Sequence, residues 1–193
     1  MLEQLLEFDK NIFLALNSSG IYPFWDAFWM VYTTSINWIP FYAVLAFLMF
    51  KKTNTKMFVL TLVVIALMIA FTDQITNVFK NGFQRPRPCY AQELKGLMVL
   101  VKSWCGSPFG YFSGHSSNSM AIAVFSGLVL RYKYRYAIYG LIIWAIFMGY
   151  SRIYIGVHYP LDVFSGFIFG GFSGYLFYRL NNYLQSRFTL VRE

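Results

Sequence analysis

The chain alternates between long apolar stretches and short polar connections, and this pattern predicts its helices. A helix that crosses a bilayer needs about 20 mostly apolar residues, because each residue rises about 1.5 Å through about 30 Å of hydrocarbon. The fold class expected from the pattern is therefore an all-α integral membrane protein. We predict five transmembrane helices, from Phe24 to Phe50, Met57 to Phe79, Ser116 to Leu130, Tyr136 to Tyr150 and Leu161 to Tyr178.

The first predicted span contains a proline and a polar stretch. Pro40 removes a backbone donor from a helix interior, which bends or breaks the helix. We expect a kinked helix or two half-helices, and we count them as one span. The polar stretch consists of Thr33, Thr34, Ser35 and Asn37.

The segment ahead of the first span has the spacing of an amphipathic helix. Glu3, Glu7, Asp9 and Lys10 fall opposite an apolar face. A helix of this kind lies on a membrane with its apolar face in the lipid. We predict an N-terminal interfacial helix, and an ordinary helix that faces water is the alternative. The apolar face comprises Leu2, Leu5, Leu6, Ile12, Phe13 and Leu16.

The composition agrees with a membrane protein. Charged residues make up 12% of the chain, compared with roughly 25% in soluble domains. No linker-like segment divides the chain, so we expect residues 1–193 to form a single domain. The net charge of +8 would suggest nucleic acid in a soluble protein. Here most basic residues lie between apolar stretches, where they contact anionic headgroups, so we expect lipid and no nucleic acid as partners.

The basic connections predict the orientation. Lys and Arg concentrate in residues 51–56, in residues 131–135 and in the tail at Arg179, Arg187 and Arg192. Short loops rich in Lys and Arg stay in the cytoplasm. The N-terminus, the segment 80–112 and the connection 151–160 are therefore expected outside. Cys89 and Cys105 both fall in the outer segment, where they form either a disulfide or two unpaired thiols.

Histidine and carboxylate side chains occur at the outer ends of the predicted spans. His115 and His158 are the two histidines of the chain. Pro160 suits a first helical position, which places Asp162 in the next turn, within reach of the His158 ring. A carboxylate at one imidazole nitrogen fixes the tautomer and leaves the other nitrogen free to attack. An inert structural histidine and a helix-dipole partner are the alternatives.

Cations and a helix N-terminus complete the set of candidate groups for a functional site. Lys80, Arg85 and Arg87 follow the second span, and Ser113 and Gly114 precede the helix that carries His115. Free N–H groups at a helix N-terminus attract phosphate, and guanidinium groups match its oxygens in pairs. A basic cluster that binds headgroups is the alternative. Neither a carboxylate cluster nor an HExxH-like spacing indicates a metal site, so we expect no metal and no cofactor.

Three motifs in this order resemble those of the type 2 phosphatidic acid phosphatases. They are Lys80 with Arg87-Pro88, then Ser113-Gly114-His115, then Ser151-Arg152 with His158 and Asp162. They span residues 80–162, a little under half of the chain. The layout also resembles small bacterial members with five spans. One departure is Phe112, where the family usually has proline, and we expect it to alter loop rigidity and substrate fit more than the chemistry.

The resemblance implies a role for each motif residue. His158 would be the nucleophile that forms a phosphohistidine, Asp162 would orient it and His115 would protonate the leaving oxygen. Arg85 is not part of the core pattern. The phosphate-binding groups implied by the resemblance are Lys80, Arg87, Ser113, Gly114 and Arg152.

The resemblance also implies the reaction and its setting. We expect a metal-independent lipid phosphatase, in a bacterial inner membrane, with its active site facing the periplasm. Undecaprenyl diphosphate is the first substrate considered, and lipid A, phosphatidylglycerophosphate and phosphatidic acid are alternatives. A lipid phosphotransferase and a non-catalytic lipid-binding protein are the competing functions.

Overall fold

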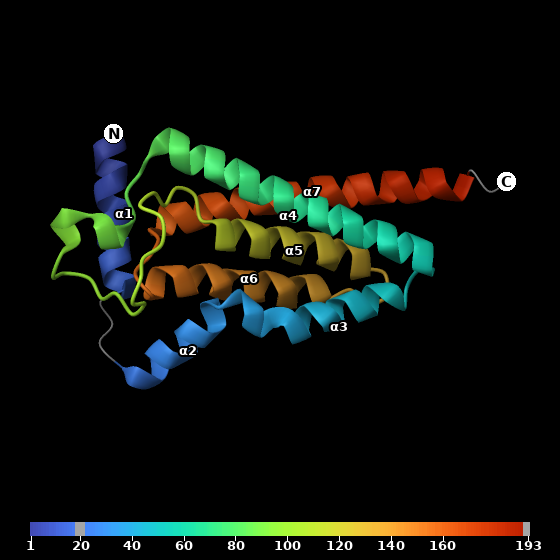
Figure 1. The fold of residues 1–193 in the computed structure, drawn as a ribbon, viewed down its shortest axis with the longest axis horizontal. Helices are drawn as coiled ribbons and strands as arrows, with labels where there is room; N and C mark the ends of the chain where they lie inside the picture. Colours follow the sequence, from blue (N-terminus) through green and yellow to red (C-terminus); the bar gives the residue numbers. More distant parts are fainter. Residues whose placement is uncertain (18–21, 191–193) are drawn as a thin grey trace.

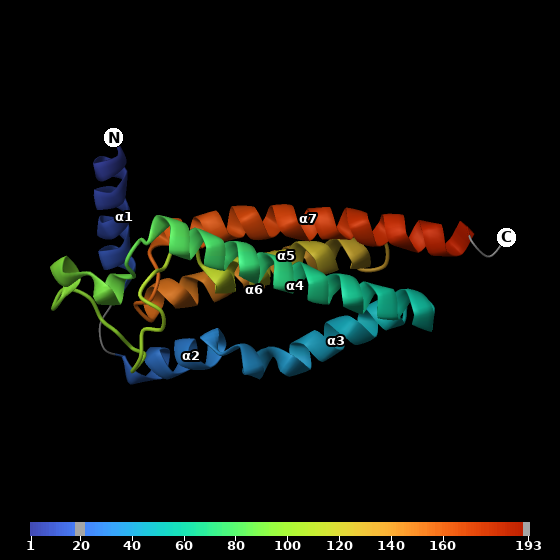
Figure 2. The same cartoon turned by 45° about the horizontal axis from the view of Figure 1, so that its top comes forward.

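The computed structural model describes residues 1–17 and 22–190, and within them the regular structure is helical apart from an isolated antiparallel bridge between Pro86 and Phe109. Figures 1 and 2 show the long helices side by side, with α1 lying across one end of the bundle. The elements are α1 Leu2–Asn17, α2 Pro23–Thr33, η1 Ser35–Trp38, α3 Ile39–Phe50, α4 Thr55–Phe83, η2 Pro88–Tyr90, η3 Gln92–Leu94, α5 Gly114–Leu130, α6 Ala137–Tyr154 and α7 Pro160–Leu190.

Each of the five predicted spans coincides with helix, but not all of them have the length and composition of a span. Among the described residues, α4 and α6 do, and α2 with η1 and α3 counts as a third if the pair, bent by 69°, is one broken span. The predicted kink of the first span is therefore confirmed, and the break falls at Thr34 in the polar stretch, with Pro40 in the first turn of α3. The helix α5 has 17 residues, and the second half of α7 is polar. Both pack against other helices; the polar residues of α5 are mostly buried, whereas Arg179, Asn182 and Arg187 in the second half of α7 are exposed.

Helix α5 lies at the centre of the bundle, packed mainly against α6 and α7. Gly166, Gly170 and Gly174 of α7 face the α5 backbone so closely that a Cβ atom would lie 2.7, 2.2 and 2.6 Å from its carbonyl oxygens. Small residues at this spacing let two membrane helices approach backbone to backbone. We call this contact the glycine face of α7.

The interfacial helix differs from its prediction in one residue. Asp9, which the pattern assigned to the polar face, is 4% exposed and points into the bundle. Its oxygens accept hydrogen bonds from Arg85 and from the Leu161 backbone, and these partners make the burial of a carboxylate tolerable. Phe13 is fully buried against Tyr159, as an apolar residue of that face should be.

The two ends of the bundle differ in charge and in the segments that lie there. The basic connections around residues 51–54 and 131–136 lie at one end, together with the C-terminal part of α7 (Figure 1). The segment between α4 and α5, the connection between α6 and α7, and helix α1 lie at the other end. Arg192 of the predicted cytoplasmic tail falls outside the described residues. All three motifs therefore gather at the end opposite the basic connections.

Candidate active site

A cavity of about 360 Å³ opens where α4, α5 and α6 reach the motif-bearing end. Lys80, Arg87, Gly114, His115, Arg152 and His158 all line it, although they come from different elements. The remaining lining residues are Ser35, Tyr42, Asp73, Asn118, Ser119, Ile122 and Met148. The structure therefore brings together six of the predicted site residues in one cavity, and it places Asp162 and Ser113 behind its wall.

The turn between α6 and α7 presents His158. Gly156 adopts φ +84°, a conformation suited to glycine, and its missing side chain leaves room for the Val99 carbonyl. The carbonyl of Arg152 then accepts hydrogen bonds from the backbone of Val157 and His158. Pro160 begins α7, and Asp162 in its first turn accepts from the Tyr159 N–H at 3.1 Å, as in half of a capping box.

The contacts of His158 define its tautomer. Its Nε2 lies 3.2 Å from Arg87 Nη1, and its Nδ1 lies 3.4 Å from Asp162 Oδ2. Because a guanidinium only donates, Nε2 accepts, and the ring proton belongs on Nδ1 facing the carboxylate. Burial, followed by the charges of Arg87, Arg152 and Lys80, holds the pKa of His158 well below 6.5. The ring is thus neutral at pH 7, with the Nε2 lone pair on the side of the cations.

Both arginines of the cavity are buried and incompletely paired. Arg87 donates from Nη2 to Ser107 at 3.2 Å, and Arg152 donates from Nη1 to Thr33 at 2.7 Å. Within the part of the chain that the structure describes, the Nε atoms of both are buried without a hydrogen-bond partner. Buried donors of this kind usually have acceptors, so an anion with several oxygens is the ligand that suits the site.

The N-terminus of α5 forms the opposite wall. Ser113 is its N-cap, and the Ser113 hydroxyl accepts from the Ser116 N–H at 3.4 Å. Ser113 is fully buried and its own N–H donates to the Asp162 carbonyl, which ties α5 to α7. The sequence interpretation placed Ser113 on the phosphate; the structure shows its hydroxyl in the cap. Gly114 leaves space for Lys80, whose Nζ would lie 3.8 Å from a Cβ there.

Phe112, the residue in place of the usual proline, is 3% exposed and packs between α4 and α7. Its ring lies 5.1 Å from those of both Phe79 and Phe169. It is not among the cavity-lining residues. Phe112 therefore anchors the segment before α5 through apolar packing.

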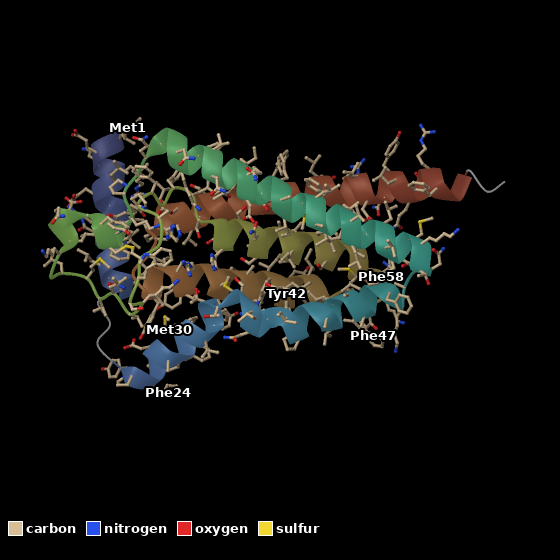
Figure 3. The ribbon with its side chains drawn as sticks, in the orientation of Figure 1. Met1, Phe24, Met30, Tyr42, Phe47 and Phe58 are labelled. Carbon is tan, nitrogen blue, oxygen red and sulfur yellow. A yellow bond between two sulfur atoms is a disulfide. The ribbon has the colours of Figure 1, made fainter. Side chains whose placement is uncertain are left out.

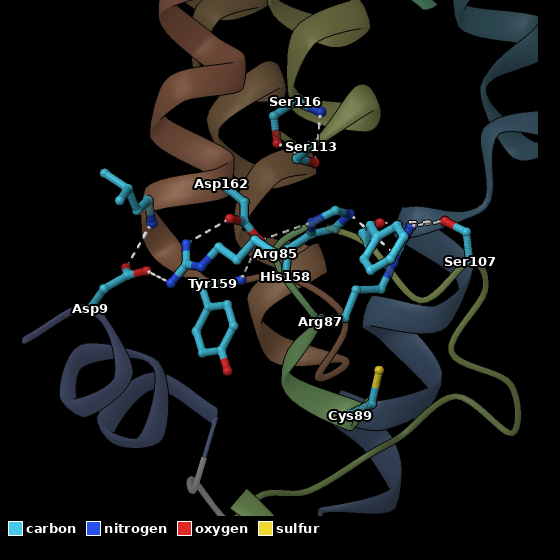
Figure 4. A network of polar contacts seen from close by, with 12 residues as sticks. Asp9, Arg85, Arg87, Cys89, Ser107, Ser113, Ser116, His158, Tyr159 and Asp162 are labelled. Atoms are coloured by element: carbon cyan, nitrogen blue, oxygen red, sulfur yellow. Dashed lines mark hydrogen bonds and ion pairs between the residues drawn. The ribbon is translucent and has the colours of Figure 1, made fainter. Parts of the chain in front are cut away.

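Sequence reasoning missed three residues that support the site. Thr33 holds Arg152, and its place in a polar stretch of an apolar span was the available signal. Arg85 was set outside the motif and Asp9 on the wrong helix face, yet Arg85 contacts Asp162 and Asp9 contacts Arg85 (Figure 4). Neither pairing has a sequence signal, because the partners are 76 and 77 residues apart.

A disulfide joins Cys89 and Cys105 beside Arg87, with their Cα atoms 6.4 Å apart. It closes a loop with a sequence separation of 16, which corresponds to about 3 kcal/mol of stabilisation from the restricted unfolded chain. We expect Cys89→Ser to lower the thermal midpoint in detergent by several degrees while the secondary structure stays helical. Circular dichroism during heating measures this, and an unchanged midpoint would contradict it.

A second, apolar cavity of about 630 Å³ adjoins the first between α3, α4 and α5. Ser35, Tyr42, Asn118 and Ile122 line both cavities, and Tyr42 is labelled in Figure 3. The rest of its lining is almost entirely apolar, including Ile39, Leu45, Leu62, Ile65 and Met68. The charged cavity is thus continuous with an apolar groove that runs along η1 and α3 between Ser35 and Met49.

Comparison with known proteins gives the family. The PAP2 superfamily model matches residues 61–186. A lipid A 4'-phosphatase of Bacteroides thetaiotaomicron is 35% identical over 97% of this chain and 83% of its own, and one of Porphyromonas gingivalis is 30% identical over 96% and 78%. The crystal structure of a transmembrane PAP2 type phosphatidylglycerolphosphate phosphatase from Bacillus subtilis superposes with a TM-score of 0.71, at 23% identity over 93% of this chain and 87% of that one. The chain therefore belongs to the PAP2 superfamily and is a membrane lipid phosphatase.

Proposed function

We propose that the enzyme removes a phosphate group from a lipid through a phosphohistidine on His158. The observation that carries this proposal is the state of the His158 ring. Asp162 faces Nδ1, while the Nε2 lone pair points toward Arg87 and the cavity. A neutral imidazole in that position is a nucleophile at pH 7, and no deprotonation is needed first.

The first chemical step transfers the phosphoryl group. Phosphate oxygens take the unfilled donors of Arg87 and Arg152, together with Lys80 and the N–H groups at the start of α5. Nε2 attacks phosphorus, the bond to the lipid oxygen breaks, and His115 gives its proton to that oxygen. Asp162 stabilises the positive charge that develops on the His158 ring.

The second step regenerates the enzyme. Water attacks the phosphohistidine, the P–N bond breaks and its electrons return to Nε2. His115, which lost its proton in the first step, accepts one from the water. Inorganic phosphate then leaves. The cations supply the charge stabilisation in both steps, so we propose that no metal ion takes part.

For the substrate, we propose a glycolipid that carries a phosphate monoester, of the lipid A 4'-phosphate class. Two relatives with that activity cover nearly the whole chain. The wall between the two cavities also suits a sugar: Asp73, on α4, is exposed and accepts from Asn118 at 2.8 Å. A carboxylate near a phosphate site is unfavourable unless ligand donors such as hydroxyl groups meet it. Undecaprenyl diphosphate, the first expectation from sequence, offers fewer such donors and becomes the second candidate.

The apolar groove and the charge distribution support the proposed binding of a lipid and the proposed side of the membrane. Acyl chains of the lipid would occupy the apolar groove while the headgroup reaches the cations. The basic connections lie at the end opposite the site, and by the positive-inside rule this supports an active site at the periplasmic face of a bacterial inner membrane. Phosphotransfer to a second lipid and lipid binding without reaction are the competing functions.

Substrate preference is tested by phosphate release in detergent from lipid A, undecaprenyl diphosphate and phosphatidic acid. We expect kcat/KM to be at least about 10-fold higher for lipid A, and EDTA to leave it unchanged. Asp73→Asn should remove much of that preference and leave phosphatidic acid hydrolysis nearly constant. A faster reaction with undecaprenyl diphosphate would contradict the proposed substrate. Loss of activity with EDTA would contradict the metal-free mechanism, and release only on addition of a lipid acceptor would indicate phosphotransfer.

A further inference from the structure

The carboxylate that faces His158 is itself held by charged contacts outside the three motifs. Arg85 donates from Nη1 to Asp162 Oδ1 at 2.8 Å and from Nη2 to Asp9 Oδ2 at 2.6 Å, as Figure 4 shows. The Arg85 guanidinium also lies over the Tyr159 ring, 4.2 Å from its centroid. One arginine therefore bridges a carboxylate of α1 and a carboxylate of α7.

This bridge is buried, so its charges depend on one another. The side chains of Arg85, Asp9 and Asp162 are 16%, 4% and 0% exposed. Burial raises the pKa of Asp9, and the hydrogen bonds from Arg85 and Leu161 oppose that rise. Burial alone would lower the pKa of Arg85, but Asp162 and Asp9 outweigh it and the pKa is raised. Removing one member leaves an unpaired buried charge on its partner.

The bridge fixes the direction in which Asp162 points. Its Oδ1 is taken by Arg85, and its Oδ2 accepts from the Tyr159 N–H and faces His158 Nδ1. With one oxygen held by a guanidinium, the carboxylate cannot turn its other oxygen away from the histidine. Asp9 adds a second constraint, since its Oδ1 accepts from the Leu161 N–H at 2.8 Å and so holds the first turn of α7.

We propose that Asp9 and Arg85 are positioning residues that act on His158 through Asp162, so that helix α1 completes the active site. The inference rests on the proposed function, in which His158 is the nucleophile. Neither residue lines the cavity where the phosphate binds. Their loss should therefore slow phosphoryl transfer and leave the affinity for phosphate in place.

The test measures kcat, KM and the inhibition constant of inorganic phosphate for single variants. We expect Arg85→Gln to lower kcat about 100-fold, as misorientation of a reacting group does, and Asp9→Asn about 10-fold. KM and the phosphate inhibition constant should stay within about threefold. Arg85→Lys keeps the charge but cannot bridge both carboxylates, so it should recover part of the lost rate.

A matched control and a double variant separate positioning from a general loss of packing. Asp26 also ties an N-terminal helix to the bundle, because it accepts from the Tyr154 hydroxyl at 2.9 Å, but it does not contact the bridge. Asp26→Asn should keep kcat within about twofold. Asp9→Asn combined with Arg85→Gln should be no slower than Arg85→Gln alone, since both act through one carboxylate.

Two results would overturn the inference: wild-type kcat in both Arg85→Gln and Asp9→Asn, or an equal loss of kcat in Asp26→Asn. Arg85→Lys keeps the test decisive if Arg85→Gln does not fold. Failure of the proposed function gives a different result, because His158→Ala would then still release phosphate whatever the bridge variants do.

Discussion

Replacement of His158 by alanine is expected to lower phosphate release by about 10⁴-fold or more, because it removes the atom that accepts the phosphoryl group. His158 is 2% exposed and its Nε2 contacts Arg87. The cations of the cavity remain in this variant, so inorganic phosphate should still bind. The measurement is phosphate release from lipid A in detergent, combined with acid-labile labelling of the enzyme by radioactive phosphate.

The controls for this variant separate chemistry from folding. Wild-type enzyme quenched during turnover should carry label that alkali preserves and acid releases, as expected for a phosphohistidine. His158→Ala should carry none and should elute as the wild type does on size exclusion. Label that persists in His158→Ala would show that another residue is the nucleophile.

His115→Asn is expected to lower kcat on a lipid phosphate by about 10³-fold, within the range that general acids contribute. His115 lines the cavity at the N-terminus of α5, across from His158. A lipid alkoxide is a poor leaving group, so its departure needs a proton. The same variant should lose less than about 10-fold on p-nitrophenyl phosphate, whose phenolate leaves without protonation.

The comparison of the two leaving groups is the decisive measurement for His115. His158→Ala should lose both activities, because the nucleophile is needed whatever group departs. Equal losses on the two substrates in His115→Asn would assign His115 to phosphate binding instead of proton transfer. The rates of wild type and variant should be compared at saturating substrate, where differences in binding do not contribute.

The sequence predicted the helices because they depend on local pattern, and the roles of the site residues stay predictions. Each span predicted from an apolar run coincides with helix. The motifs pointed to Lys80, His115 and His158, and the fold brings these three residues to one cavity. Among the described residues, α4 and α6 qualify as spans by length and composition alone. The polar residues of α5 are mostly buried against other helices, whereas Arg179 and Arg187 of α7 are exposed, and composition alone does not reveal which face a helix buries.

The contacts that support the site could not be predicted from the sequence, because they join segments that are far apart along the chain. Asp9 looked like a surface acid, since an acidic residue on an amphipathic helix usually faces water. It is buried only because Arg85 and the start of α7 lie opposite it in the fold. Arg152 lies in the cavity, where a phosphate-binding residue is expected, whereas its partner Thr33 was considered only as part of a kink.

The glycine face of α7 has a consequence for how the enzyme responds to its bilayer. A membrane that thins or thickens makes helices tilt and slide against one another. Gly166 and Gly170 pack α7 tightly against the first turns of α5. We therefore expect α7, which begins beside His158, and α5, which carries His115, to tilt together as one body. Changes in lipid length should therefore alter how readily substrate reaches the groove, while the spacing between the two histidines stays constant.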